Sequence, residues 1–114
     1  MEKLYIIGWG LSGGFGGVRY YEVIEAEAED DATIRAWENA CEYYEMYSGS
    51  NGLRSVSDIM GEEGCDEEEA TGIYEEERES WLEYSAVPYS KEAEEKVKYY
   101  HYNNPFKHLT DVDQ

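Results

Sequence analysis

The segments KLYIIGW (Lys3 to Trp9) and VRYYEVIEAEA (Val18 to Ala28) decide the fold. The first is rich in β-branched and aromatic residues, and the second alternates apolar with polar residues, so each predicts a β-strand. Between them, Gly8 to Gly17 contains six glycines, a composition typical of a turn. Together these segments predict an N-terminal β-hairpin.

The alternation in the second segment changes face part-way along. Tyr21 and Val23 fall on one face of a regular strand, whereas Ile24 and Ala26 fall on the other. A β-bulge or a strong twist within this strand would reconcile its two halves.

A helix is predicted from about Ala32 to Ser48. The acidic run Glu29 to Asp31 supplies capping groups and negative charge at its start, and Gly49 ends it. Its apolar residues recur at helical spacing and are expected to pack on the hairpin: Ile34, Trp37, Ala40, Cys41, Tyr44 and Tyr47.

Two further helices begin at capping patterns. Ser55 and Asp58 form an S-x-x-D start for a short helix that a glycine ends. Asp66 and Glu69 form a similar pattern for the longest helix, roughly Asp66 to Tyr84.

The segment that follows Pro88 has two interpretations. Residues 90–98 suit a short helix, which is slightly favoured, whereas Lys96 to Tyr102 (KVKYYHY) also suits a third strand beside the hairpin. The sequence therefore predicts one α+β domain over residues 1–102. It consists of the N-terminal hairpin, with or without a third C-terminal strand, packed against three to four helices. Residues 103–114 are expected to form a short mobile tail.

The charge balance is the least ordinary feature of the composition. The chain has 27 acidic and 9 basic residues, a net charge of −18, of which −17 falls between Met1 and Tyr84. The acidity thus belongs to the folded body. Such a field repels nucleic acid and anionic membranes and attracts basic surfaces. Solubility alone is the alternative explanation.

The expected environment follows from what the sequence lacks. It has neither an apolar run of about 20 residues nor the basic and apolar regions of a signal peptide at its start. A soluble cytoplasmic protein is expected. Cys41 and Cys65 are therefore expected to be reduced thiols rather than a disulfide.

Motifs of catalysis and cofactor binding are weak or missing. Gly8 to Gly13 matches G-x-G-x-x-G, but a dinucleotide site needs a helix that opens at this point, and a β-like run follows instead. His101 and His108 lack the spacing of a zinc site, and the acidic segments lack that of an EF-hand loop. No catalytic residue, cofactor or metal is predicted.

The longest predicted helix separates apolar from acidic residues. Its apolar side comprises Ala70, Ile73, Tyr74, Trp81 and Tyr84. The opposite side comprises Glu68, Glu69, Glu75, Glu76, Glu79 and Glu83. Glu77 projects from the apolar side, which predicts either a carboxylate paired with an arginine or one that reaches solvent at the helix edge.

The acidic side has a charge density close to that of a nucleic acid. Asp66 to Glu83 carries a net charge of −8, or about one charge per 3 Å at a rise of roughly 1.5 Å per residue. A DNA strand carries one phosphate per roughly 3.4 Å. Like charges four residues apart destabilise a helix, so this arrangement is easier to explain if the charge has a function.

The chain also resembles a family of small acidic tailed-phage proteins over about two thirds of its length. The resemblance rests on Gly13 to Gly17 (GGFGG), Glu25 to Glu29 (EAEAE), Tyr47 to Gly49 (YSG), Leu53 to Val56 (LRSV) and Glu79 to Tyr84 (ESWLEY). The segment after Pro88 is not covered, and the family brings no catalytic residues. In kind, the chain is similar to phage anti-CRISPR and anti-restriction proteins that imitate DNA. This resemblance implies a host-defence inhibitor.

The leading hypothesis is therefore an inhibitor whose six glutamates occupy a basic nucleic-acid channel of a bacterial protein. Tyr43 and Tyr89 are expected to be exposed and to anchor the partner. Direct binding to nucleic acid or to membrane is not expected, and the oligomeric state stays open. Two alternatives are a binder of a small signalling nucleotide, through the glycine-rich segment and aromatic residues, and a non-inhibitory accessory or assembly protein.

Overall fold

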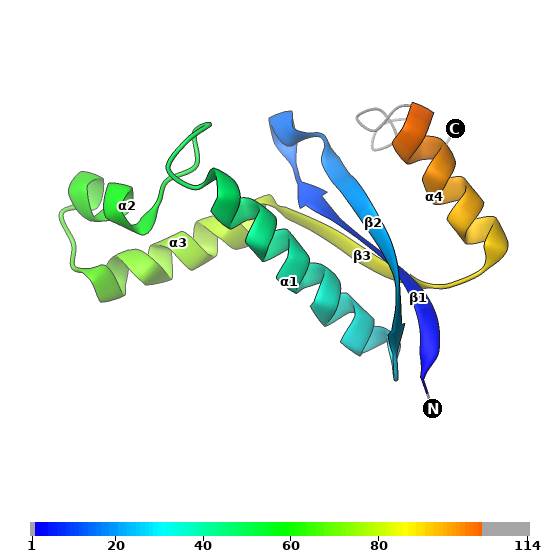
Figure 1. Ribbon diagram of the computed structural model, residues 1–114. Helices are drawn as coiled ribbons and strands as arrows, with labels where there is room; N and C mark the ends of the chain where they lie inside the picture. Colours follow the sequence, from blue (N-terminus) through cyan, green and yellow to red (C-terminus); the bar gives the residue numbers. More distant parts are fainter. Residues whose placement is uncertain (1, 104–114) are drawn as a thin grey trace.

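The computed structural model describes residues 2–103 and has an α+β architecture. A three-stranded antiparallel sheet lies between α1 and α4, and α2 with α3 extends to one side (Figure 1). The elements are β1 (Lys3–Leu11), a 3-10 turn (Gly13–Phe15), β2 (Gly17–Ala26), α1 (Glu29–Tyr47), α2 (Val56–Glu63), α3 (Glu67–Trp81), β3 (Leu82–Pro88) and α4 (Lys91–Asn103). Except for Asn103, the predicted tail lies outside the described residues.

The sheet has the strand order β2-β1-β3, so the first strand is central. The predicted hairpin is confirmed, with Ile7 opposite Glu22 on β2 and opposite Ala86 on β3. A third strand is present, but it is formed by Leu82–Pro88. The alternative strand at Lys96 to Tyr102 was wrong, because these residues belong to α4.

The prediction for the helix from about Asp66 to Tyr84 was wrong in its length and its end. This helix, α3, has 15 residues, and the longest helix is α1 with 19. The helix α3 stops at Trp81, and Leu82 has extended backbone angles (φ −68°, ψ 135°). Leu82, Tyr84 and Ala86 lie opposite Leu11, Trp9 and Ile7 of β1, respectively. The apolar alternation of the strand explains why this segment pairs with β1.

Two glycines predicted in the turn lie within β1 instead, where they allow close packing. The register of the hairpin shifts between Trp9 and Gly10, and Arg19 is the extra residue on β2. A Cβ atom on Gly10 would lie 2.0 Å from the carbonyl oxygen of Gly17. A side chain at this position is therefore incompatible with the backbone of the bulge.

This bulge is not what places apolar residues on both faces of β2. It lies at Arg19, whereas the predicted change of face falls between Val23 and Ile24. Ile24 and Ala26 belong to the core under α1, and α4 packs beside β2 on the opposite side of the sheet (Figure 1). Both faces of β2 are apolar because each has a helix against it.

The helix α1 approaches the sheet through small residues. Ala32, Ala36 and Ala40 are fully buried. The first two belong to a core cluster with Ile7, and Ala40 belongs to a second cluster with Leu11. Alanines spaced by four residues let a helix axis come close to a sheet. The buried face of α1 comprises Ala32, Ala36, Ala40, Cys41, Tyr43 and Tyr44. The predicted stripe was thus wrong at Ile34, which is 54% exposed, and Trp37 and Tyr47 are only half-buried.

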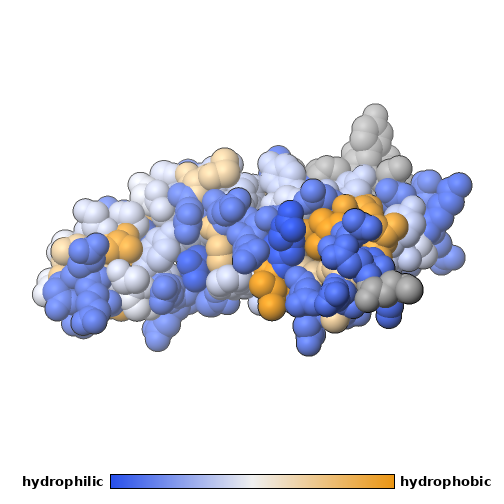
Figure 2. Space-filling view, turned by 60° about the horizontal axis from the view of Figure 1, so that its bottom comes forward, coloured by the Kyte–Doolittle hydropathy of each residue, from blue (hydrophilic) through white to orange (hydrophobic). Residues whose placement is uncertain are grey.

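We call the segment Val56 to Trp81, which contains α2 and α3, the acidic arm. Its capping predictions are confirmed: Ser55 and Asp58 form a capping box, and the carboxylate of Asp66 accepts a hydrogen bond from the backbone N–H of Glu69. The two helices pack against each other and extend away from the sheet, in a molecule of 51 × 34 × 19 Å (Figure 1). The arm is therefore accessible over much of its surface, and hydrophilic residues are prominent on its visible side, at the left of Figure 2.

Candidate functional site: the acidic arm

The arm concentrates the charge of the protein. It carries eleven acidic residues and one basic residue, Arg78, and thus a net charge of −10. Much of this charge lies on one exposed face of α3, where the structure brings together five of the six predicted glutamates: Glu68, Glu69, Glu75, Glu76 and Glu79. The only buried residue of α3, Ala70, lies on the other side of the helix.

Glu83 does not belong to this face, which corrects the prediction. It lies on β3 opposite Gly10 and is half-buried. The helical period placed it with the other glutamates, but the chain becomes extended at Leu82, so the period no longer applies.

The remaining five glutamates keep a spacing similar to that of phosphates. Glu68 and Glu79 are eleven residues apart, a distance of about 16 Å along the helix axis. Five carboxylates over this length give about one charge per 4 Å, against roughly 3.4 Å for the phosphates of a DNA strand. A cationic groove that follows a nucleic-acid backbone would meet a comparable series of negative charges.

Arg54 holds the arm together. It is half-buried beside three carboxylates: it forms an ion pair with Glu77 and lies 3.0 Å from Glu62 and 3.1 Å from Glu63. Of the two interpretations of Glu77, pairing with an arginine is the one that the structure shows. Hydrogen bonding to Glu77, followed by that to Glu63 and Glu62, raises the pKa of the Arg54 guanidinium. A single cation therefore links the end of α2 to the middle of α3.

Replacing Arg54 with glutamine is expected to loosen α2 from α3. Three carboxylates would then face one another without a cation, and their repulsion favours separation of the helices. Amide hydrogen exchange should accelerate in α2 and α3 and stay unchanged in β1. Arg54→Lys is the matched control, since it keeps the charge but loses the planar fork, and it should have an intermediate effect. Uniform acceleration across the whole protein would contradict this role.

Glu79 differs from the other glutamates of the face because it also connects the arm to α1. One carboxylate oxygen accepts a hydrogen bond of 2.8 Å from the indole N–H of Trp37 and lies 3.8 Å from a guanidinium nitrogen of Arg78. The Arg78 guanidinium in turn lies over the Trp37 ring, 5.5 Å from its centre. Glu79 therefore has a structural role, and variants that test the face should leave it intact.

The two tyrosines predicted as exposed anchors lie elsewhere. Tyr43 is only 6% exposed and packs edge-on against Tyr20 and Tyr47, and burial is the main cause that raises its pKa. Tyr89 is half-buried, and its hydroxyl donates a hydrogen bond of 3.1 Å to Glu94. The expected exposure was thus wrong for Tyr43, and neither tyrosine lies on the acidic face of α3. A contact of either tyrosine with the partner stays a prediction.

Sequence reasoning missed the part played by Arg54 and an aromatic pocket beside α1. Arg54 follows a turn and precedes the cap Ser55, so only its position among many acids hints at its role. The pocket joins residues of β1, β2 and α1 that lie far apart in the sequence, and no local pattern identifies it. Both features arise from tertiary packing.

The glycine-rich segment has the geometry of a strand and a turn. Residues 13–15 form a single 3-10 turn, after which β2 begins at Gly17. A pyrophosphate-binding site needs the N-terminus of a helix after such glycines, but here a strand follows the turn. Of residues 2–103, no helix is long and apolar enough to cross a membrane, and no group of three or more His, Cys, Asp or Glu residues is placed to hold a metal ion.

Comparisons with known proteins identify no relative whose site could be compared with this one. The chain matches no family model, no curated protein and no solved structure.

Proposed function

We propose that this protein binds the nucleic-acid site of a basic bacterial protein through the exposed face of α3 and thereby blocks that site. The observation that carries the proposal is the row of exposed glutamates on α3, with a spacing close to that of phosphates. Arginine and lysine residues that normally contact phosphates would pair with these carboxylates.

The rigidity of the arm supports the same function. Binding loses less conformational entropy when the charged groups are already fixed in place. Arg54 ties α2 to α3, and Glu79 ties α3 to α1 through Trp37. Both ties engage the C-terminal half of α3, at Glu77 and Glu79, and the other glutamates of the face precede them on the same helix.

The class of partner is proposed from the resemblance to small phage proteins. A phage protein of this charge and size would act in the bacterial cytoplasm, on a defence nuclease of the CRISPR or restriction type. Such nucleases hold nucleic acid in positively charged channels. The channel both attracts the arm at long range and supplies its binding groups.

The nucleotide-binding alternative has less support. It relied on the glycine-rich segment as a phosphate cradle, and that segment is part of β1 and a short turn. The accessory-protein alternative predicts that the protein does not inhibit cleavage by the nuclease, and the cleavage assay described next tests this.

Ionic strength tests the proposal. Binding to a purified CRISPR effector or restriction nuclease would be measured by calorimetry between 50 and 200 mM salt. If about five phosphate contacts are replaced, affinity should fall on the order of 10² to 10³-fold over this range. Cleavage by the nuclease should be inhibited in parallel. Affinity that does not respond to salt, or binding without inhibition, would contradict the proposal.

A further inference from the structure

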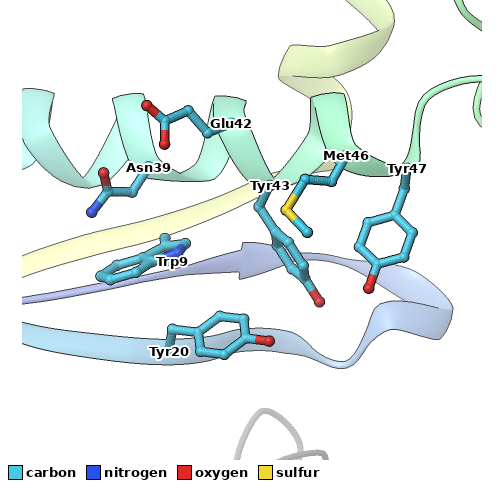
Figure 3. A pocket seen from close by; sticks show the side chains of 7 residues that line it. All are labelled: Trp9, Tyr20, Asn39, Glu42, Tyr43, Met46 and Tyr47. Carbon is cyan, nitrogen blue, oxygen red and sulfur yellow. The ribbon is translucent and has the colours of Figure 1, made fainter.

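A second feature lies outside the acidic arm, between α1 and the hairpin. It is a pocket of about 300 Å³, at the small end of the range for ligand sites. Its lining comprises Trp9, Tyr20, Asn39, Glu42, Tyr43, Met46 and Tyr47 (Figure 3). A pocket of this size suits one side chain of a partner.

The pocket has aromatic walls. Trp9 and Tyr20 are stacked, with ring centres 6.1 Å apart and an interplanar angle of 29°. Tyr43 meets Tyr20 edge-on at 5.5 Å and Tyr47 at 5.3 Å. Figure 3 shows Trp9 and Tyr20 on the strands, with Tyr43 and Tyr47 extending from α1 toward them. Aromatic faces of this kind attract cations.

The rim of the pocket combines an exposed apolar side chain with a carboxylate. Met46 is 75% exposed and Tyr20 is 44% exposed, so a partner can reach both side chains. Glu42 lies one turn and Asn39 two turns before Met46 on α1, and both provide oxygen atoms that accept hydrogen bonds. Glu38 and Glu45, on the same helix, are exposed and add negative charge nearby.

One cation is also near the pocket. Arg19 on β2 lowers the pKa of Tyr43, although burial and the neighbouring tyrosines raise it by more. Arg19 has an interaction of its own and is not among the lining residues. The lining itself contains one acidic residue, Glu42, and no basic residue.

We infer that this pocket takes an arginine side chain of the partner protein. A guanidinium group can stack on the rings of Trp9 or Tyr20 while its N–H groups meet the Glu42 carboxylate, and its methylene groups can contact Met46. A lysine ammonium offers no plane to stack, and an anion would be repelled. This inference rests on the proposed function and extends it. While the arm occupies the nucleic-acid channel, an arginine at the edge of that channel would bind this pocket as a second contact.

The inference is tested without the partner. The full chain is titrated with N-acetyl-arginine amide, and the signals of the Trp9 indole and the tyrosine rings are followed by NMR. We expect saturable changes in chemical shift that are confined to the residues of the pocket. N-acetyl-citrulline amide has the same shape without the charge and should bind at least tenfold more weakly. Equal binding of the two compounds, shifts spread over the surface, or no binding would overturn the inference.

Two matched variants locate the binding group. Glu42→Gln removes the carboxylate of the rim and should weaken arginine binding about tenfold, whereas Glu45→Gln, on the same helix but outside the pocket, should leave it unchanged. Equal weakening by both would mean that only the general charge matters. Replacing Glu68, Glu75 and Glu76 with lysine should leave arginine binding by the pocket unchanged. An error in the inference about the pocket can therefore be told apart from an error in the proposed function of the arm.

Discussion

Replacing Glu68, Glu75 and Glu76 with lysine is expected to abolish binding to the nucleic-acid-binding partner while the fold stays intact. All three are exposed on α3, and no hydrogen bond or ion pair between the described residues ties them to another element. The substitutions change the arm's net charge from −10 to −4 and place cations against a cationic channel, which costs several kcal/mol. Affinity measured by calorimetry should fall by more than a hundredfold, with an unchanged circular dichroism spectrum.

The control for this variant changes the total charge by the same amount at another site. Glu22, Glu25 and Glu27 are exposed on β2 or just beyond it, away from the arm. Their replacement with lysine should weaken binding only slightly, through the long-range field. If both triple variants lose binding equally, total charge rather than the face of α3 is responsible. If the α3 variant binds normally, the arm is not the interface.

Gly10→Ala is expected to have the largest effect on stability. The new Cβ would lie 2.0 Å from the carbonyl oxygen of Gly17 and 2.9 Å from the backbone nitrogen of Arg19. Both are backbone atoms, so no side-chain rotation relieves the clash and the hairpin must shift. Such strain costs roughly 3 kcal/mol, a large part of the stability of a small domain. Chemical denaturation measures this loss directly.

Gly14→Ala is the matched control within the same segment. A Cβ at Gly14 would have no atom within 4 Å. Its free energy of unfolding should stay within about 0.5 kcal/mol of that of the original protein, as for most surface substitutions. If Gly10→Ala proved as mild as Gly14→Ala, the bulge at Arg19 would not be as tightly packed as described.

The elements that the sequence predicted are those fixed by local interactions. The caps at Ser55 and Asp66 depend on residues three positions away, and both were found as expected. Leu82 to Tyr84 was predicted as a helix end, because Trp81 and Tyr84 also fit a helical period, and no strand was predicted from Ser85 to Pro88. Formation of the strand Leu82 to Pro88 depends on pairing with β1, about 75 residues earlier in the chain.

The same distinction explains which site residues could be predicted. Five glutamates share a face because α3 is a helix, and a helical period is enough to group them. The positions of Glu83 and Tyr43 depend instead on β3 and on aromatic packing under the hairpin. The Arg54 cluster and the aromatic pocket likewise join separate elements, and no spacing within the sequence indicates them.

Mutual exclusion with nucleic acid is the most direct measurement of the central claim. The partner nuclease is loaded with a fluorescently labelled duplex or guide-target hybrid, and the acidic protein is added at constant ionic strength. We expect the labelled nucleic acid to be released, as seen by a fall in fluorescence anisotropy, with one acidic protein bound per channel emptied. A stable ternary complex, in which the nuclease holds both the nucleic acid and the acidic protein, would contradict the account.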